Sequence, residues 1–195
     1  MTDRATTQAE EQSPTASFDD PAELRARDGV EVVDRQRPMP DEKFEALRDR
    51  YDAIEGVVQV ALTDGDGRVL LWGVEDAAPP GGSVDGGEDW VAAAQSAMED
   101  VTGQAVRVEE PVFLEVTEFH REGDESESFP APSVHFAASL VDSDEAFVED
   151  PSVPEGFEHP MFEEDPELDW YAAVTDDVHE NHRHHVERYL EWGQP

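Results

Sequence analysis

Apolar and polar residues alternate with a period of two in several short segments of this chain, which predicts a β-sheet. Val58, Val60 and Leu62 share one face of a predicted strand over 57–62, and an Asp-Gly-Asp-Gly turn follows it. Such a turn favours a hairpin, so residues 68–72 are predicted to return as the second strand. The same kind of pattern predicts further extended segments at 30–34, 106–108, 112–120, 134–140 and 168–174.

A period near that of the α-helix appears most clearly in residues 90–102. Asp89 can cap the N-terminus of this helix, and Gly103 can end it. Its apolar residues form one stripe, made of Trp90, Ala94, Ala97, Met98 and Val101. Less regular patterns predict helices at 21–27, at 42–54 after a cap at Asp41, and up to Trp192 after a cap at Asp176 or Asp177.

Prolines and glycines mark the predicted loops between these elements. Pro79 and Pro80, with four glycines after them, predict a loop immediately before the 90–102 helix. Residues 142–169 are acidic, contain prolines and show little periodicity, so they are predicted to form a functional or mobile loop. Pro130 and Pro132 place the start of the 134–140 strand at a sheet edge or in a loop.

These elements predict an α/β fold with three parts. Residues 1–20 are polar and are predicted to form a disordered tail. Residues 21–55 hold one short strand and one amphipathic helix, too little core for an independent domain, so they are expected to pack as an extension on the rest. The main domain is predicted to span 56–192.

The large negative charge of the chain indicates a solvent of high salt concentration. Its formal net charge is −36, from 49 acidic and 13 basic residues, and Lys43 is the sole lysine. Such self-repulsion destabilises a compact state in dilute buffer, but at 1 M salt the Debye length is only about 3 Å. A surplus of acid with almost no lysine resembles the cytoplasmic proteins of salt-in halophiles.

The composition also argues against several classes of function. No basic patch is available to meet phosphates, so nucleic acid is not an expected partner. The absence of cysteine excludes disulfides, thiolate catalysis and thiolate metal sites. No signal peptide and no apolar run near the length of a membrane span is present, so a cytoplasmic protein without a membrane partner is expected.

The loop and helix over 82–104 carry a motif with a known spacing. Gly82 and Glu88 are followed at fixed distances by Met98, Asp100 and Gly103. The segment resembles the Nudix box, G-x5-E-x7-R-E-U-x-E-E-x-G-U, in which U is a bulky apolar residue. The spacing is kept, but several box residues are replaced: Ser96 stands for the arginine, Ala97 for the first glutamate, Asp100 and Val101 for the next two, and Gln104 for the last apolar residue.

The resemblance implies a fold, an activity and a site. The fold is a mixed β-sheet sandwiched between helices (α/β/α), and the activity is metal-dependent hydrolysis of nucleoside diphosphate-linked substrates with Mg²⁺ or Mn²⁺. Asp100 and Glu99 would be metal ligands, Glu88 would join them as a catalytic residue, and Gly81 and Gly82 would line the substrate loop. Hard divalent ions need several oxygen ligands, and here most box ligands are replaced, so weakened catalysis is predicted.

Two other interpretations of the 90–102 helix stay open. The helix can serve packing alone, in a non-catalytic Nudix-like module that needs no cofactor and binds a nucleotide, a phosphorylated metabolite or a protein partner. Alternatively, a shifted register can present Gln95, Glu99 and Glu88 along one face. Oxygens that converge near Asp100 would favour the enzyme, whereas an apolar floor of Ala97 and Val101 would favour the binding module.

Other candidate residues lie outside the box. Four histidines on the predicted last helix have spacings that allow a zinc site, but a partly solvated, charge-offsetting helix is the simpler interpretation: His179, His182, His184 and His185. His120 and His135 lie on strands that can face each other, where either can be a general base or an ordinary sheet residue. Glu163, Glu164 and Asp165 resemble the late acidic residue of Nudix sites by location only. Trp72, Trp90 and Trp170 are assigned to the core rather than to base stacking.

Overall fold

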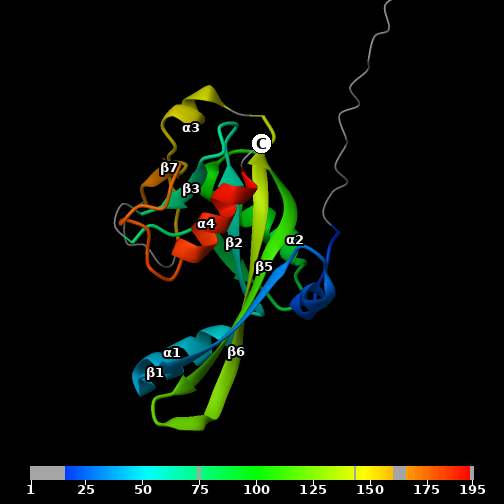
Figure 1. The fold of residues 1–195 in the computed structure, drawn as a ribbon, viewed down its shortest axis with the longest axis vertical. Coiled ribbons are helices and arrows are strands. Elements are labelled where there is room, and N and C mark those ends of the chain that lie inside the picture. Colours follow the sequence, from blue (N-terminus) through cyan, green and yellow to red (C-terminus); the bar gives the residue numbers. More distant parts are fainter. Residues whose placement is uncertain (1–15, 74–75, 143, 160–165, 194–195) are drawn as a thin grey trace, which may run out of the picture.

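The computed structural model describes residues 16–73, 76–142, 144–159 and 166–193 and shows one twisted mixed sheet with helices on both faces (Figure 1). The sheet has seven strands in the order β1-β5-β6-β2-β3-β7, and β4 pairs with β2 outside this path. Its strands are β1 (Glu31–Met39), β2 (Gly56–Thr63), β3 (Val69–Trp72), β4 (Gly81–Val84), β5 (Val106–Arg121), β6 (Asp124–Leu140) and β7 (Leu168–Tyr171).

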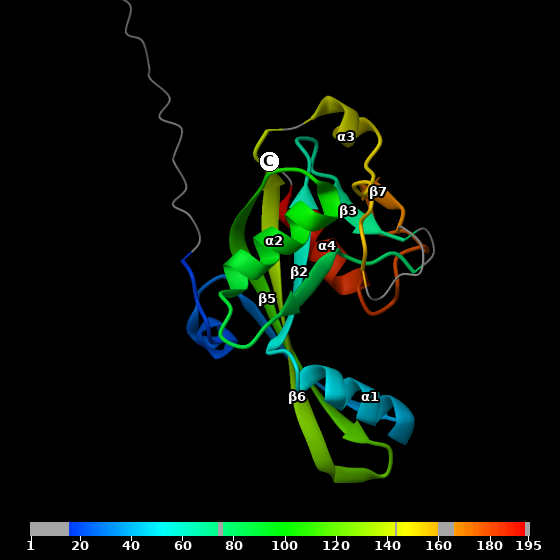
Figure 2. The same ribbon diagram turned by 180° about the vertical axis from the view of Figure 1, so that it is seen from behind.

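Helices cover the two faces of the sheet. Helix α2 (Trp90–Thr102) lies on one face and α4 (Arg183–Trp192) on the other, as the front and back views show (Figures 1 and 2). Each face has its own buried apolar cluster: Val58, Val60, Leu62 and Met98 belong to the α2 side, and Ala61, Leu71, Phe113 and Val186 to the α4 side. The predicted α/β class, with a mixed sheet between helices, is therefore confirmed.

Alternation in the sequence explains how one strand serves both clusters. In β2 the even residues enter the α2-side cluster and Ala61 the α4-side cluster, as a side-chain period of two requires. β2 runs parallel to β6 and antiparallel to β3 and β4, while β1 runs parallel to β5. The predicted hairpin is confirmed, and the Oδ1 of Asp64 accepts hydrogen bonds from the backbone of Asp66 and Arg68 to hold its turn.

The capping signals of α2 act as predicted. The Oδ1 of Asp89 accepts a hydrogen bond from the backbone N–H of Ala92 at 2.8 Å, and Gly103 adopts φ +64° as the left-handed C-cap. Four of the five residues of the apolar stripe are buried, and Trp90 is fully enclosed. The two caps and the apolar face together determine where this helix begins and ends and which side it buries.

Several boundaries differ from the prediction, each for a physical reason. The two segments predicted at 106–108 and 112–120 are one strand, β5, because bulges near Glu110 and Pro111 absorb the break in alternation. β6 runs through both prolines: β2 pairs with it only from Ser133 onward, so at Pro130 the strand lies at an edge, one of the two places predicted. β1 likewise continues through Pro38 as an edge strand.

Two helix predictions and one loop prediction also need correction. Helix α1 (Asp41–Tyr51) begins at Asp41, with Pro40 at its N-cap and no side-chain cap, so Asp41 is a first-turn residue. A short helix, α3 (Glu145–Glu149), lies in the predicted 142–169 loop. α4 begins only at Arg183, because turns fill the stretch after Asp177. The 21–27 prediction corresponds to a 3₁₀ helix, η1 (Pro21–Ala26).

The N-terminal segment is built into the sheet rather than laid on it. β1 pairs with β5 from Glu31 to Met39, and the side chain of Phe18 is buried and stacks on Trp90 with ring centroids 6.5 Å apart. Residues 1–15 of the predicted tail lie outside the described residues. None of the helices in the described part of the chain is long and apolar enough to cross a membrane.

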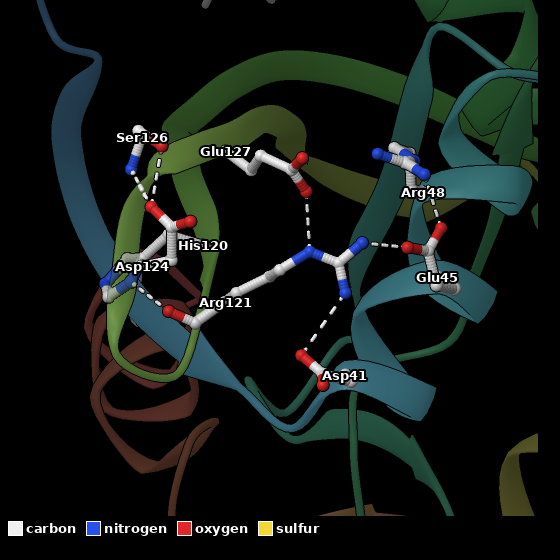
Figure 3. A network of polar contacts seen from close by, with 8 residues as sticks. All are labelled: Asp41, Glu45, Arg48, His120, Arg121, Asp124, Ser126 and Glu127. Carbon is white, nitrogen blue, oxygen red and sulfur yellow. Dashed lines mark hydrogen bonds and ion pairs between the residues drawn. The ribbon is translucent and has the colours of Figure 1, made fainter.

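The far ends of β5 and β6, with α1 packed on them, extend away from the rest of the sheet (Figure 1). Arg121 joins the parts of this arm: its Nε donates to Glu127 at 2.6 Å, its Nη1 to Asp41 at 3.2 Å, and its Nη2 to Glu45 (Figure 3). Its guanidinium also lies 4.6 Å from the ring centroid of Phe44. In this arm the contacts of Arg121 with three carboxylates hold α1 to the β5–β6 hairpin.

Candidate functional site

Two adjoining cavities surround β4 and together form the candidate site, which we call the cleft. The α1-side cavity has a volume of about 220 Å³, and the α2-side cavity about 270 Å³. Three residues of β4 and one histidine line both cavities: Gly81, Gly82, Ser83 and His159. A ligand bound in one cavity would therefore lie next to the other cavity.

The segment predicted as a glycine-rich loop supplies this shared wall as a strand. Gly81 and Gly82 pair with Gln59 and Val58 of β2. A Cβ on Gly81 would lie 1.9 Å from the carbonyl oxygen of Val58, and one on Gly82 would lie 3.0 Å from the Cβ of Ala97. Both glycines thus allow close packing of β4, and both line the two cavities, where they were predicted to contact substrate.

The wall that α2 contributes to the α2-side cavity is largely alkyl. Ala93, Ala97 and Val101 line the cavity, together with Ser96 and Asp100. In the box pattern two of these positions, 97 and 101, carry glutamates. The observed floor is the apolar one that the sequence analysis associated with a binding module.

The predicted catalytic residues do not all reach the cleft. Glu88 and Asp100 line the α2-side cavity, whereas Glu99 is exposed and its Oε1 accepts a hydrogen bond from Gln95 at 3.1 Å. One residue along a helix is a rotation of about 100°, which turns Glu99 away when Asp100 faces the cavity. The Oε2 of Glu88 accepts from the backbone of Asp85 at 3.0 Å, so this carboxylate closes its own loop.

The carboxylates of the α2-side cavity are the available donors for a divalent ion. Glu88, Asp100 and Glu158 line the α2-side cavity, but among the residues that the structure describes no three His, Asp or Glu side chains are placed to hold a metal ion. Mg²⁺ demands close to octahedral oxygen coordination at about 2.1 Å. The described residues therefore do not fit a resident Mg²⁺ or Mn²⁺ ion held by the protein alone. Glu163, Glu164 and Asp165 lie outside the described residues.

The α1-side cavity differs in chemistry from its neighbour. Its lining includes two aromatic side chains, Tyr51 and Trp72, and the amide of Gln59. Arg50 is the one fully charged side chain among its described lining residues, and within the described part of the chain Arg50 has no ion pair. The ring of His159 packs edge-on against Trp72 with centroids 5.0 Å apart. The cleft is thus acidic at α2 and cationic and aromatic at α1.

Two histidines of the α1-side cavity are neutral at physiological pH. Burial, and then the charge of Arg50, lower the pKa of His159 below its usual value. Burial, and then the neighbouring His185 and His179, lower the pKa of His182 to about 4. Neither imidazole therefore adds positive charge beside Arg50 at pH 7.

The remaining histidines form a second polar site, which we call the histidine cluster. It consists of His135 on β6, Glu115 on β5, and His182, His185 and Tyr189 at α4. The rings of His135 and His185 are tilted by 54° with centroids 4.3 Å apart, the Nδ1 of His135 contacts the hydroxyl of Tyr189, and the Nε2 of His185 lies 3.2 Å from Glu115. His185 is buried, whereas His184 is exposed and pairs with Glu31, so the helix is partly solvated and only His185 departs from the predicted solvated, charge-offsetting role.

Burial dominates the electrostatics of the histidine cluster. It lowers the pKa of His135 well below its usual value and raises that of Tyr189 well above. For Glu115, burial alone would raise the pKa, but contact with His185 and the charge of Arg35 outweigh it, and the pKa is lowered. No zinc geometry arises from the four histidines predicted to share the last helix, within the described residues.

His120 and His135 do not meet. In the β5–β6 ladder His135 lies opposite Phe113, and His120 lies opposite Ser128. His135 is a buried sheet residue with a hydroxyl partner, the simpler of the two interpretations. Trp72, Trp90 and Trp170 are all buried, as assigned, but Trp72 also lines the α1-side cavity.

Sequence reasoning missed most of the α1-side cavity. Arg50 and Tyr51 end a helix that was assigned to an extension, and Glu158 and His159 lie in a segment without periodicity. Gln59 carried the one usable signal, because it is an amide in an otherwise apolar strand. Their proximity depends on how α1 and residues 157–159 meet β4, which no local pattern encodes.

Comparison with known proteins gives matches at the level of structure only. No family model matches the sequence, and no curated protein matches it. A hydrolase of the NUDIX family from Clostridium perfringens aligns over 71% of this chain and 97% of its own, with 16% identity and a TM-score of 0.48. An ADP-ribose pyrophosphatase from Streptococcus suis covers 71% and 91%, with 10% identity and a TM-score of 0.44.

A UDP-X diphosphatase aligns over 76% of this chain and 71% of its own, with 15% identity and a TM-score of 0.45. These activities belong to those proteins. At identities and TM-scores this low, the matches assign neither a family nor an activity to this chain. Its function has to be argued from the cleft.

Proposed function

We propose that this chain is a Nudix-like module that binds a nucleotide or another phosphorylated small molecule in the cleft, with hydrolysis of the diphosphate bond weak or lost. The spacing of the box over 82–104 supports the Nudix part of the proposal. The cleft beside the box helix supports the binding part, since ligand sites are concave and mostly apolar, with a few placed polar groups.

The observation that carries the proposal is the wall formed by α2. Ala97 and Val101 turn alkyl groups to the cavity at the positions where the box has carboxylates, while Asp100 remains. The cavity is kept although the ligand set is reduced. A protein that needed only the packing of this helix would have no requirement for an adjoining cavity with an arginine and an amide in its lining.

Calorimetric titration in molar KCl tests binding directly. The probes are nucleoside diphosphates, a nucleoside diphosphate sugar and ribose 5-phosphate, each with and without Mg²⁺. Saturable binding of at least one phosphorylated probe is expected, together with no release of phosphate above the buffer control. Absence of binding by all probes, with the protein shown to be folded, would contradict the proposal.

Metal-dependent hydrolysis is the second candidate function, and one observation favours it. Three carboxylates, those of Glu88, Asp100 and Glu158, line the same cavity. Mg²⁺ is commonly held by one or two carboxylates together with the phosphates of a substrate, so a metal that arrives on the ligand needs fewer protein ligands. Turnover that requires Mg²⁺ or Mn²⁺ and disappears in Asp100→Ala would establish this function in place of binding alone.

A further inference from the structure

Gln59 and Arg50 give the α1-side cavity the features of a nucleotide subsite. We propose that this cavity holds an adenine nucleotide, with the base edge on the amide of Gln59 and the phosphates at Arg50. The inference rests on the proposed function and adds the identity of the base and the direction in which the ligand lies.

The amide of Gln59 is the specific element. Gln59 belongs to the lining of the cavity, and its Oε1 is buried and meets no hydrogen-bond donor among the described residues. A buried acceptor without a donor is unfavourable by roughly 1–3 kcal/mol, which a ligand N–H would recover. A carboxamide presents an acceptor and a donor side by side, and adenine presents an amino donor beside a ring-nitrogen acceptor, so the two match in a bidentate pair.

The walls around Gln59 suit a planar ring. Tyr51 and Trp72 line the same cavity, with Val57 and Pro79 as further apolar surface. Aromatic faces stack on nucleobases with about 1–3 kcal/mol per base, whichever base it is. The aromatic walls therefore contribute affinity, and the amide contributes the choice of base.

Arg50 sets the direction of the ligand. Seven arginines in the described residues form ion pairs with carboxylates: Arg25, Arg35, Arg48, Arg68, Arg121, Arg183 and Arg188. Arg50 forms none within that part of the chain, although acidic residues outnumber basic ones almost fourfold, 49 to 13. A guanidinium left unpaired at a cavity is suited to an anionic group of the ligand.

The acidic cavity on the other side of β4 strengthens this orientation. Glu88, Asp100 and Glu158 line the α2-side cavity, and no arginine or lysine does so among its described lining residues. Without a cation, phosphates are repelled from that side and attracted to Arg50. The nucleotide is thus held with its phosphates away from α2, which agrees with a helix that has lost most of its box carboxylates.

The test compares two ligands that differ in one amino group. Full-length protein in molar KCl with EDTA is titrated with ADP and with purine riboside 5′-diphosphate, which lacks the 6-amino donor. ADP is expected to bind roughly tenfold or more tightly, because a site built to hydrogen-bond a group rejects an analogue without it. Gln59→Leu is expected to remove this preference, whereas Gln95→Leu, an exposed amide on α2, should keep it.

The phosphate end is tested with ADP against adenosine. Arg50→Gln is expected to weaken ADP binding about tenfold and to leave adenosine binding unchanged. Arg37→Gln, an exposed arginine on β1 that is also unpaired among the described residues, should change neither. If Gln59→Leu does not fold, the two-ligand comparison on the wild type still decides. Equal affinity for ADP and purine riboside 5′-diphosphate would overturn the assignment of Gln59 and leave the proposed function standing, whereas absence of binding by every nucleotide would overturn both.

Discussion

The cleft and the histidine cluster both place polar side chains next to buried apolar residues of the sheet, but their polar groups have different partners. In the histidine cluster, imidazoles, a carboxylate and a phenol contact one another, with His135 and His185 only 4.3 Å apart between ring centroids. In the cleft, Arg50 and Gln59 line the α1-side cavity, and among the described residues Arg50 forms no ion pair and the buried Oε1 of Gln59 no hydrogen bond. The two sites meet only at His182, which lines the α1-side cavity.

This difference separates a structural site from a binding site. In the histidine cluster the contact of His135 with Tyr189 and the ion pair of His185 with Glu115 join α4 to the sheet, although the Nδ1 atoms of His182 and His185 have no hydrogen-bond partner among the described residues. Polar contacts of this kind between packed elements contribute to the specificity and stability of the fold. Polar groups left unpaired at a cavity make no such contribution and are suited to a ligand. Disturbing the histidine cluster should therefore change stability, and disturbing the α1-side cavity should change affinity.

Acidification is expected to give the largest effect, and it acts on the histidine cluster. The pKa of His182 is about 4 when folded and 6.5 ordinarily, so between these values the unfolded chain binds a proton that the folded chain does not. Stability is complete above about pH 6.5 and falls as the pH drops towards 4. The loss from His182 is about 3 kcal/mol at most, and His135 acts in the same direction. Urea unfolding at pH 7.5 and 4.5, in molar KCl, measures it.

The control separates histidine from the many carboxylates that also titrate on acidification. His182→Gln should reduce the difference in unfolding free energy between the two pH values, whereas His120→Gln, on β5 outside the cluster, should keep the wild-type difference. Identical pH dependence in wild type and His182→Gln would show that the histidine cluster does not control acid stability.

Loss of one hydroxyl in the histidine cluster should have the next largest effect. Tyr189→Phe removes the hydroxyl that contacts the Nδ1 of His135 and leaves that buried nitrogen without its partner. A decrease in unfolding free energy of about 1–3 kcal/mol is expected, with nucleotide affinity unchanged. Tyr171→Phe on β7 is the matched control. A variant as stable as the wild type but weaker in binding would reverse the roles assigned to the two sites.

How much of this could be read from the sequence differs between fold and site. Asp89, Gly103 and the apolar stripe between them predicted α2, because caps and helical period are local signals. The alternation in β2 predicted both faces of the sheet for the same reason. The cleft was predicted only on its α2 side, through the box spacing. Arg50 and Gln59 lie in different elements, α1 and β2, and no local pattern in the sequence shows that both side chains line one cavity.

Removal of one negative charge at α2 should have the smallest effect. Asp100→Asn removes a carboxylate from the α2-side cavity, but in the proposed orientation the phosphates lie at Arg50. At molar salt the Debye length is about 3 Å, so the charge of Asp100 is largely screened at the phosphates. Affinity for ADP in EDTA should change by less than about twofold. Asp100 is exposed, so stability should change by less than roughly 0.5 kcal/mol. A large loss of affinity would place the phosphates at α2 instead.

The central claim is that the cleft binds a nucleotide while α2 no longer supports hydrolysis. Phosphate release from saturating nucleoside diphosphates, in molar KCl with Mg²⁺ or Mn²⁺, tests it most directly when wild type is run beside Ser96→Arg/Ala97→Glu/Val101→Glu. The wild type should bind without turnover, and the variant, once shown to be folded, should gain metal-dependent release. Metal-dependent turnover by the wild type, abolished in Asp100→Ala, would contradict the claim even if the triple variant failed to fold.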